Sequence, residues 1–285
     1  MPLIIAFSVG AALLNAISVI LQRRVAGNPA PGELFRVPFI KSLTLNKVWL
    51  VGFGLQAVAF LLQAAALRHG SLIVVEPLLT IDLVFMLVVL HFKYNVHANP
   101  RDWGAVVMIC IGLAGLLVST DVHHVRHQFS YSSWVGAVST ILFLIIAAIF
   151  VVRRAESSRQ RAWIMGAAAG LSFSLGAAFT KLTVSRLHFG VLAEFHGWPI
   201  YALILSGILA ILMTQNAYGA GPLVSSQPIM EITEPIVSIV LAILLFGDNI
   251  DLRPAAIFVE VVTGLTACVG IWLLSSSDSS QLQNA

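Results

Sequence analysis

Residues 223–246, LVSSQPIMEITEPIVSIVLAILLF, decide the fold. The stretch is apolar and long enough to cross a membrane, because about 20 apolar residues in a helix cover a hydrocarbon core of about 30 Å. Gln227, Glu231, Glu234 and Ser238 follow one another at spacings of four, three and four, which places them on one helical face. A carboxylate at the centre of a spanning helix costs roughly 2.5–3.5 kcal/mol on insertion scales. We therefore expect this face to be turned to the protein interior or to water.

The chain as a whole has the composition of a protein in lipid. Its 285 residues are 58% hydrophobic and 10% charged, with a mean hydropathy of +0.92, whereas soluble domains carry about 25% charged residues. The net charge of +3 comes from basic residues scattered through short loops, which indicate topology and not a nucleic-acid partner. Cys110 and Cys268 lie inside apolar runs and outside any CxxC or Cys/His spacing, so we expect neither a disulfide nor a zinc site.

Nine apolar runs are long enough to span a bilayer. They are Pro2–Leu21, Val48–Leu67, Ser71–Phe92, Trp103–Thr120, Trp134–Val152, Ala162–Val184, Pro199–Ala217, Leu223–Phe246 and Arg253–Leu274. We predict an all-α polytopic membrane protein with about nine transmembrane helices. No charged segment precedes the first run, which favours an uncleaved span over a signal peptide. The polar residues 275–285 predict a disordered tail.

Basic residues are unevenly divided between the loops. The first, third and fifth loops hold eleven: Arg23, Arg24, Arg36, Lys41, Lys47, Lys93, Arg101, Arg153, Arg154, Arg159 and Arg161. The other loops hold four: Arg68, Arg126, Arg186 and Arg253. By the positive-inside rule we expect the odd-numbered loops in the cytoplasm, the N-terminus outside and the C-terminus in the cytoplasm of a multi-pass cell-membrane protein.

An internal repeat organises these spans. When residues 66–84 are laid on residues 217–235, Gly70 meets Gly221 and Pro77 meets Pro228, and an alanine and a leucine also coincide. The sequence predicts a four-helix unit at 1–120, a central helix at 133–152 and a second four-helix unit at 162–274. Five spans separate equivalent helices, so the units must be inverted. Inverted repeats are typical of secondary transporters, with a binding site near the bilayer midplane.

The third span carries a second set of polar groups. Glu76 precedes Pro77, Thr80 and Asp82 follow, and in the repeat alignment Asp82 falls within one residue of Glu234. We favour Asp82 and Glu234 as a pair that binds a solute, a proton or a cation, with Glu231, Glu76 and Gln227 nearby. Glu76 and Asp82 would lie on different faces of a regular helix unless Pro77 reorients the turn. The alternative is that these carboxyl groups only hold helices together by hydrogen bonds.

Pro228 and Pro235 each remove a backbone donor and disfavour helical geometry at the residue before them, which predicts a bend or break near Glu234. The secondary site candidates are Glu260, Thr80 and Lys181. We expect the Lys181 side chain to extend to the membrane interface and not to pair with a carboxylate.

Two further patterns carry weaker signals. His123, His124 and His127 form an HHxxH cluster that would have metal-ligand spacing if it were helical. Gly166 and Gly170 form a GxxxG pattern, which indicates close helix packing. The chain contains no P-loop, HExxH, nucleophile elbow or dinucleotide fingerprint, so we expect neither an enzyme nor a cofactor.

The segment QPIMEITEPIVSIVLAILLFGD, Gln227–Asp248, followed by a glycine-containing last helix, resembles the second-repeat signature of the drug/metabolite transporter (EamA-like) superfamily. In that resemblance Asp248 closes the signature helix, and the basic residue that ends the first helix of a repeat is Arg23 or Arg24 in the first unit and Lys181 in the second. Nine helices in place of ten resemble the NIPA-type magnesium transporter branch. The resemblance implies secondary transport.

The sequence thus predicts a secondary transporter that moves a small cationic or amphipathic solute by alternating access, with proton coupling as an option. The alternatives are a NIPA-type transporter of magnesium or another divalent cation, and a membrane scaffold or lipid-interacting protein that transports nothing. Its expected partners are the solute or cation and the lipid bilayer.

Overall fold

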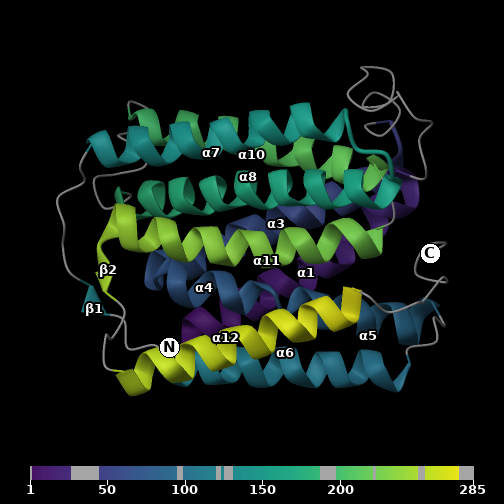
Figure 1. Cartoon of the computed structure of the whole chain (residues 1–285), viewed down its shortest axis with the longest axis horizontal. Helices are drawn as coiled ribbons and strands as arrows, with labels where there is room; N and C mark the ends of the chain where they lie inside the picture. The colour runs from purple at the N-terminus through teal and green to yellow at the C-terminus, as the bar shows by residue number, and fades with distance from the viewer. Residues whose placement is uncertain are drawn as a thin grey trace.

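The computed structural model describes residues 2–26, 45–94, 99–119, 123–124, 131–186, 197–220, 223–249 and 254–275. Its helices are α1 (Pro2–Ala26), α3 (Lys47–His69), α4 (Leu72–Leu79), α5 (Asp82–Tyr94), α6 (Pro100–Ser119), α7 (Tyr131–Val152), α8 (Ser158–Arg186), α10 (Trp198–Ala220), α11 (Leu223–Leu241), η2 (Ala242–Phe246) and α12 (Pro254–Ser275). Each of the nine predicted spans coincides with a helical segment, since α4 and α5 share the third and α11 and η2 share the eighth. The helices form one elongated bundle (Figure 1).

The surface of the bundle is suited to lipid. Seven helical segments are long and apolar enough to cross a membrane by length and composition: α1, α3, α4–α5, α7, α8, α10 and α11–η2. Large apolar side chains are exposed on the outer helices, among them Phe143 on α7, Leu205 on α10 and Phe258 on α12. Water would oppose so much exposed apolar area, whereas lipid tails accommodate it. The prediction of a polytopic helical membrane protein is confirmed.

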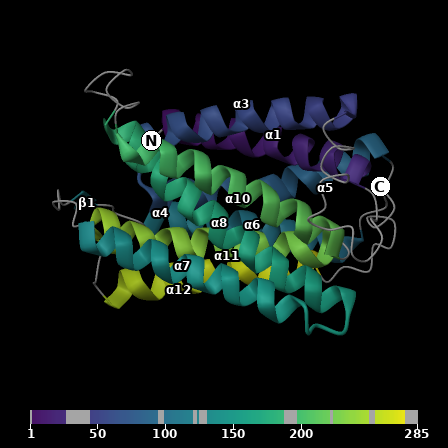
Figure 2. The ribbon, with the colours of Figure 1, turned by 90° about the horizontal axis from the view of Figure 1, so that it is seen from above.

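The start of the first described helix and the finish of the last one lie at opposite ends of the bundle. Figures 1 and 2 show α1 beginning at the end marked N, while α12 finishes at the other end, near α5. An odd number of crossings requires this arrangement. At one end of the bundle, β1 (His123–His124) pairs antiparallel with β2 (Asp248–Asn249), directly after η2. Gly247 makes the turn between η2 and β2 with φ of 64°, a left-handed conformation that favours glycine.

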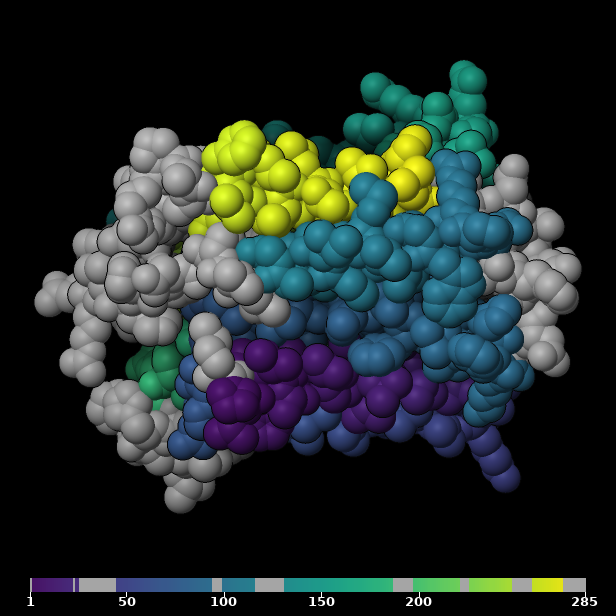
Figure 3. All heavy atoms as spheres, turned by 90° about the horizontal axis from the view of Figure 1, so that it is seen from below, coloured from purple at the N-terminus to yellow at the C-terminus, as the bar shows by residue number. Residues whose placement is uncertain are grey.

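Small residues let α6 and α12 lie against each other along one face of the bundle, as Figure 3 shows from below. A Cβ atom on Gly112 would lie 2.6 Å from the backbone nitrogen of Ala267, and one on Gly270 would lie 2.9 Å from the carbonyl oxygen of Ala105. Both distances are too short for a side chain. Such glycines allow helix backbones to approach closely in a membrane, where packing replaces the hydrophobic drive.

A similar contact joins α8 to α11 at the centre of the bundle. A Cβ atom on Gly166 would lie 2.5 Å from the carbonyl oxygen of Ser226, and one on Gly170 would lie 2.9 Å from that of Met230. One turn further, the Ser174 hydroxyl donates a hydrogen bond of 3.0 Å to the carbonyl oxygen of Glu234. The close helix packing predicted from the GxxxG pattern is confirmed, and it holds α11 against α8 at the level of its carboxyl groups.

The two proline-containing spans differ in continuity. The third span breaks after Pro77, since α4 ends at Leu79, a turn follows at residues 80–81, and α5 starts at Asp82. α11 runs unbroken from Leu223 to Leu241, so the break predicted near Glu234 is wrong. The physical reason is the neighbouring helix, because Gly166 and Gly170 hold α8 closely against α11 through this stretch. Neighbouring helices commonly allow proline-containing helices to continue in membrane proteins.

The α8–α11 contact predicts a specific sensitivity to added volume. Gly166→Ala inserts a methyl group against the Ser226 carbonyl oxygen, and overpacking of this kind costs about 1–3 kcal/mol. We expect a lower midpoint of thermal unfolding for purified protein in detergent, followed by tryptophan fluorescence. Gly136→Ala on α7 is the matched control, because a Cβ atom there meets nothing within 4 Å. Equal midpoints for both variants would contradict the close contact.

Candidate functional site

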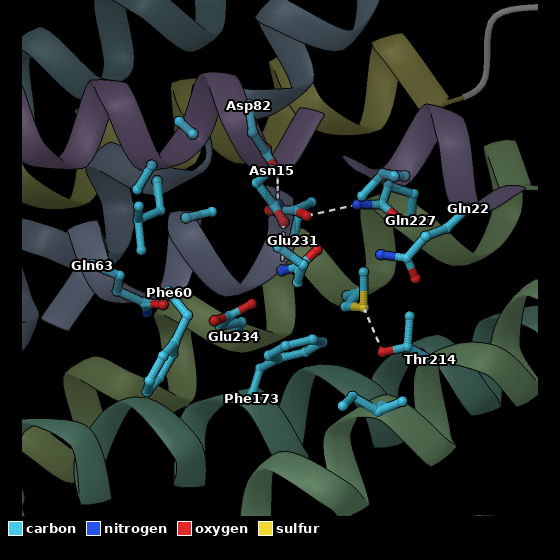
Figure 4. Close-up of a pocket in the computed structure, with 18 of the residues that line it drawn as sticks. Asn15, Gln22, Phe60, Gln63, Asp82, Phe173, Thr214, Gln227, Glu231 and Glu234 are labelled. Atoms are coloured by element: carbon cyan, nitrogen blue, oxygen red, sulfur yellow. Dashed lines mark hydrogen bonds between the residues drawn. The ribbon is translucent and has the colours of Figure 1, made fainter. Parts of the chain in front are cut away.

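A polar cavity lies inside the bundle, surrounded by residues of α1, α3, α4, α5, α8, α10 and α11 (Figure 4). Its volume is about 110 Å³, several times the roughly 10–15 Å³ that one water molecule needs. The polar residues that line it are Asn15, Gln22, Gln56, Gln63, Asp82, Thr214, Gln215, Tyr218, Gln227, Glu231 and Glu234. The cavity therefore has the room and the polar partners that several water molecules or a small hydrated ligand would need.

The structure brings the five main site candidates together. Asp82, Gln227, Glu231 and Glu234 line the cavity. Glu76 adjoins it, because its carboxyl group interacts electrostatically with that of Glu234. The polar face of α11 is therefore turned inward, and the carboxyl groups of α4, α5 and α11 converge from two regions of the chain about 150 residues apart in the repeat alignment.

Both acidic residues of the third span reach this place because the span is broken. Glu76 is the fifth residue of α4 and Asp82 the first of α5, so the turn between them changes the direction in which Asp82 points. The Thr80 hydroxyl donates to the carbonyl oxygen of Pro77 at 2.7 Å and helps to close that turn. Thr80 does not line the cavity and serves the backbone of the turn.

The carboxyl groups form one electrostatic cluster. The exposed fractions of Glu76, Asp82 and Glu231 are 2%, 3% and 6%, and Glu234 interacts electrostatically with all three. No lysine, arginine or histidine is found among the described residues that line the cavity. Four negative charges this close, away from bulk water, would repel strongly. The cluster is therefore stable only when protons or a bound cation offset its charge.

Neutral amides supply donors to three of the carboxyl groups, and of these amides only Gln227 was predicted from the sequence to belong to the site. Asn15 Nδ2 donates to Asp82 Oδ2 at 2.6 Å, and Gln227 Nε2 donates to Glu231 Oε1 at 2.8 Å. Gln63 Nε2 donates to Glu76 Oε1 at 3.1 Å. The sequence did contain a signal for the other amides. Gln56 and Gln63 lie seven residues apart in an apolar span, and an amide at the centre of such a span needs a hydrogen-bond partner inside the protein.

Two secondary candidates lie elsewhere. The Lys181 ammonium group donates to the carbonyl oxygens of Leu67, at 2.7 Å, and Gly70. These carbonyls belong to the C-terminal end of α3, where a positive charge complements the helix dipole. Lys181 thus joins α8 to the C-terminal end of α3. Glu260 lies half-buried on α12 and does not line the cavity.

The histidine cluster lies largely outside the described residues. His123 and His124 form the backbone of β1, while their side chains and all of His127 are not described. Within the described ranges, no three His, Cys, Asp or Glu side chains are grouped so that they could hold a metal ion.

Comparison with known proteins finds two relatives. An uncharacterized protein of Corynebacterium glutamicum is 27% identical over 252 residues, which is 87% of this chain and 86% of the relative. A probable magnesium transporter of Arabidopsis thaliana, NIPA9, is 20% identical over 272 residues, 92% of this chain and 79% of the relative. No protein-family model matches the chain, and no solved structure matches it. The second relative is distant and agrees with the NIPA-type resemblance seen in the sequence.

The position of Lys181 predicts a loss of stability when its charge is removed. Lys181→Met leaves two buried carbonyl groups without their donor, and a hydrogen bond to a charged group contributes about 1.5–3 kcal/mol. We expect a lower midpoint of thermal unfolding in detergent than for the wild type. Lys47→Met, at the exposed start of α3, is the control and should leave the midpoint unchanged. An unaltered midpoint for Lys181→Met would show that the contact contributes nothing to folding.

Proposed function

We propose that this protein is a secondary transporter that moves a small cation or cationic solute through the polar cavity. The observation that carries the proposal is the cluster of Glu76, Asp82, Glu231 and Glu234, which has no basic residue among the described cavity-lining residues. Intramembrane carboxyl groups are costly and usually mark a substrate or ion pathway. The distant similarity to a probable magnesium transporter supports transport over a purely structural role.

The origin of the carboxyl groups supports alternating access. Glu76 and Asp82 come from the first proposed four-helix unit, and Glu231 and Glu234 come from the second. If the units are inverted repeats, as proposed from the sequence, the cluster lies where they meet. Rocking of one unit against the other then exposes the same carboxyl groups first to one side of the membrane and then to the other.

The electrostatic interaction between Glu76 and Glu234 supports proton coupling. Two neighbouring carboxyl groups away from bulk water repel each other when both are ionised, so one of them holds a proton while no cation is bound. A cation that enters the cluster offsets the negative charge of the carboxyl groups, so the proton is no longer needed to do so. Cation binding would then release the proton, and one species would move against the other. The proposed transport involves no chemical reaction of the solute.

Magnesium is the second candidate substrate, favoured by the similarity to the probable magnesium transporter of Arabidopsis. Mg²⁺ prefers oxygen ligands, keeps several of its waters and is commonly bound by only one or two carboxylates. Carboxyl and amide oxygens surround a cavity with room for water here. These properties fit a partly hydrated Mg²⁺ ion as well as a small amine.

Flux measurements on purified protein in proteoliposomes test the proposed site. We expect Asp82→Asn and Glu234→Gln each to lower the uptake of the transported cation at least about tenfold, since each removes a charge that offsets that of the cation. Glu156→Gln, the same chemical change at an exposed residue after α7, is the control and should transport like the wild type. Full flux in both cavity variants would exclude this site.

A panel of probes identifies the substrate and its coupling. Mg²⁺, Ca²⁺, Na⁺ and methylammonium are offered with and without a pH gradient. We expect flux of at least one probe, and acceleration of that flux by an opposed proton gradient. Flux that ignores the gradient would remove the coupling and keep transport. A wild type that moves none of the probes would favour the scaffold or lipid-interacting alternative.

A further inference from the structure

A chain of side-chain amides leads from one end of the cavity to Asp82. Asn15, Ser18 and Gln22 lie along one face of α1 and are joined by Gln56 of α3 and Gln215 of α10. Gln215 Nε2 donates to Gln22 Oε1 at 3.2 Å, and Gln22 Nε2 donates to Ser18 Oγ at 2.8 Å. Ser18 Oγ lies 2.9 Å from Gln56 Oε1, and Gln56 Nε2 donates to Asn15 Oδ1 at 2.7 Å. Asn15 Nδ2 then donates to Asp82 at 2.6 Å.

The carboxylate of Asp82 fixes the donor-to-acceptor direction of the hydrogen bonds in this network. An ionised carboxylate only accepts hydrogen bonds, so Asn15 must present its amide nitrogen to Asp82 and its oxygen to Gln56. Gln56 must then present its nitrogen to Asn15 and its oxygen to Ser18. The Ser18 proton can satisfy Gln56 or the carbonyl oxygen of Gly52, which is 2.8 Å away. Asn15 is thereby held in one orientation, with its donor aimed at Asp82.

Asp82 has one oxygen that this network does not satisfy. Asp82 Oδ2 accepts from Asn15, while Oδ1 is buried and has no hydrogen-bond partner among the described residues. The side chain lines the cavity and is 3% exposed. A buried acceptor without a partner is costly, and a network that served only to satisfy Asp82 would not leave it so. The unsatisfied oxygen requires a donor or a cation from the cavity.

We infer that Asn15, oriented by Gln56, is a positioning residue that binds one oxygen of Asp82 and leaves the other as a ligand for a cation in the cavity. The inference rests on the proposed function and names Asn15 as the residue that orients Asp82, the proposed cation ligand. A cation is the chemistry that fits, because the neighbouring groups Glu76, Glu231 and Glu234 are also acidic. The amide does not touch the cation and acts through Asp82.

Asn15→Leu tests the inference because leucine has a similar volume and no donor. Uptake into proteoliposomes is measured with Mg²⁺ and with methylammonium as probes. We expect the concentration for half-maximal flux to rise about tenfold, the size expected for loss of one hydrogen bond to a charged group, while the maximal rate changes much less. Asn216→Leu is the matched control, since Asn216 is buried on the neighbouring α10, bonds its own helix and does not line the cavity.

Two further variants test the same inference if Asn15→Leu does not fold. Gln56→Leu keeps the donor and removes its anchor, so we expect a smaller rise in the half-maximal concentration. The exchange Asn15→Asp with Asp82→Asn keeps one carboxylate and one amide in contact, with Gln56 still able to donate. We expect it to recover part of the flux that Asp82→Asn loses alone.

The outcomes separate the inference from the function on which it rests. An unchanged half-maximal concentration in Asn15→Leu, with an active wild type, would overturn the inference alone. Equal rises in Asn15→Leu and Asn216→Leu would also overturn it, because both would then reflect general loss of packing. A wild type that moves neither probe would remove the proposed function and the inference together.

Discussion

The burial of four carboxyl groups inside a membrane protein is the constraint on which the rest of the structure depends. None of them can face lipid, and no basic residue among the described cavity-lining residues offsets them. Amide side chains partly stabilise them, since Asn15, Gln63 and Gln227 each donate a hydrogen bond to one carboxyl group. The remaining charge must be met by protons or by a cation, and this unmet requirement is what makes a transport role physically reasonable.

Close helix packing makes that burial possible. The glycines of α8 bring its backbone against α11, so that the polar face of α11 is pressed toward the centre of the bundle instead of toward lipid. Ser174 of α8 also binds the carbonyl group of Glu234, and α11 continues unbroken through Pro235. On the opposite wall the third span does break, which turns Asp82 into the same cavity as Glu231. α11 stays continuous past Pro235, whereas a turn that the site uses follows Pro77 in the third span.

The structure also separates groups that bind from groups that support. Lys181 joins the end of α3 to α8, and Thr80 closes the turn before Asp82. Neither lines the cavity, although both are polar and lie in apolar spans. Polarity in a span is therefore a sign that a side chain has a partner inside the protein. Whether that partner is backbone or ligand depends on which neighbouring helices surround it.

The nine apolar runs, the helical class and the inward-facing stripe of α11 could be predicted from the sequence, because hydropathy over 20 residues and a spacing of three or four are local properties. The convergence of Glu76 with Glu234, the continuity of α11 through Pro235 and the amide chain that ends on Asp82 could not. Each depends on which helices become neighbours, and contacts such as Asn15 to Asp82 join residues 67 positions apart. The sequence alone showed that polar groups had to be hidden from lipid. Only the packing of the helices decided where they meet, because a side chain buried in a bundle takes its partners from other helices.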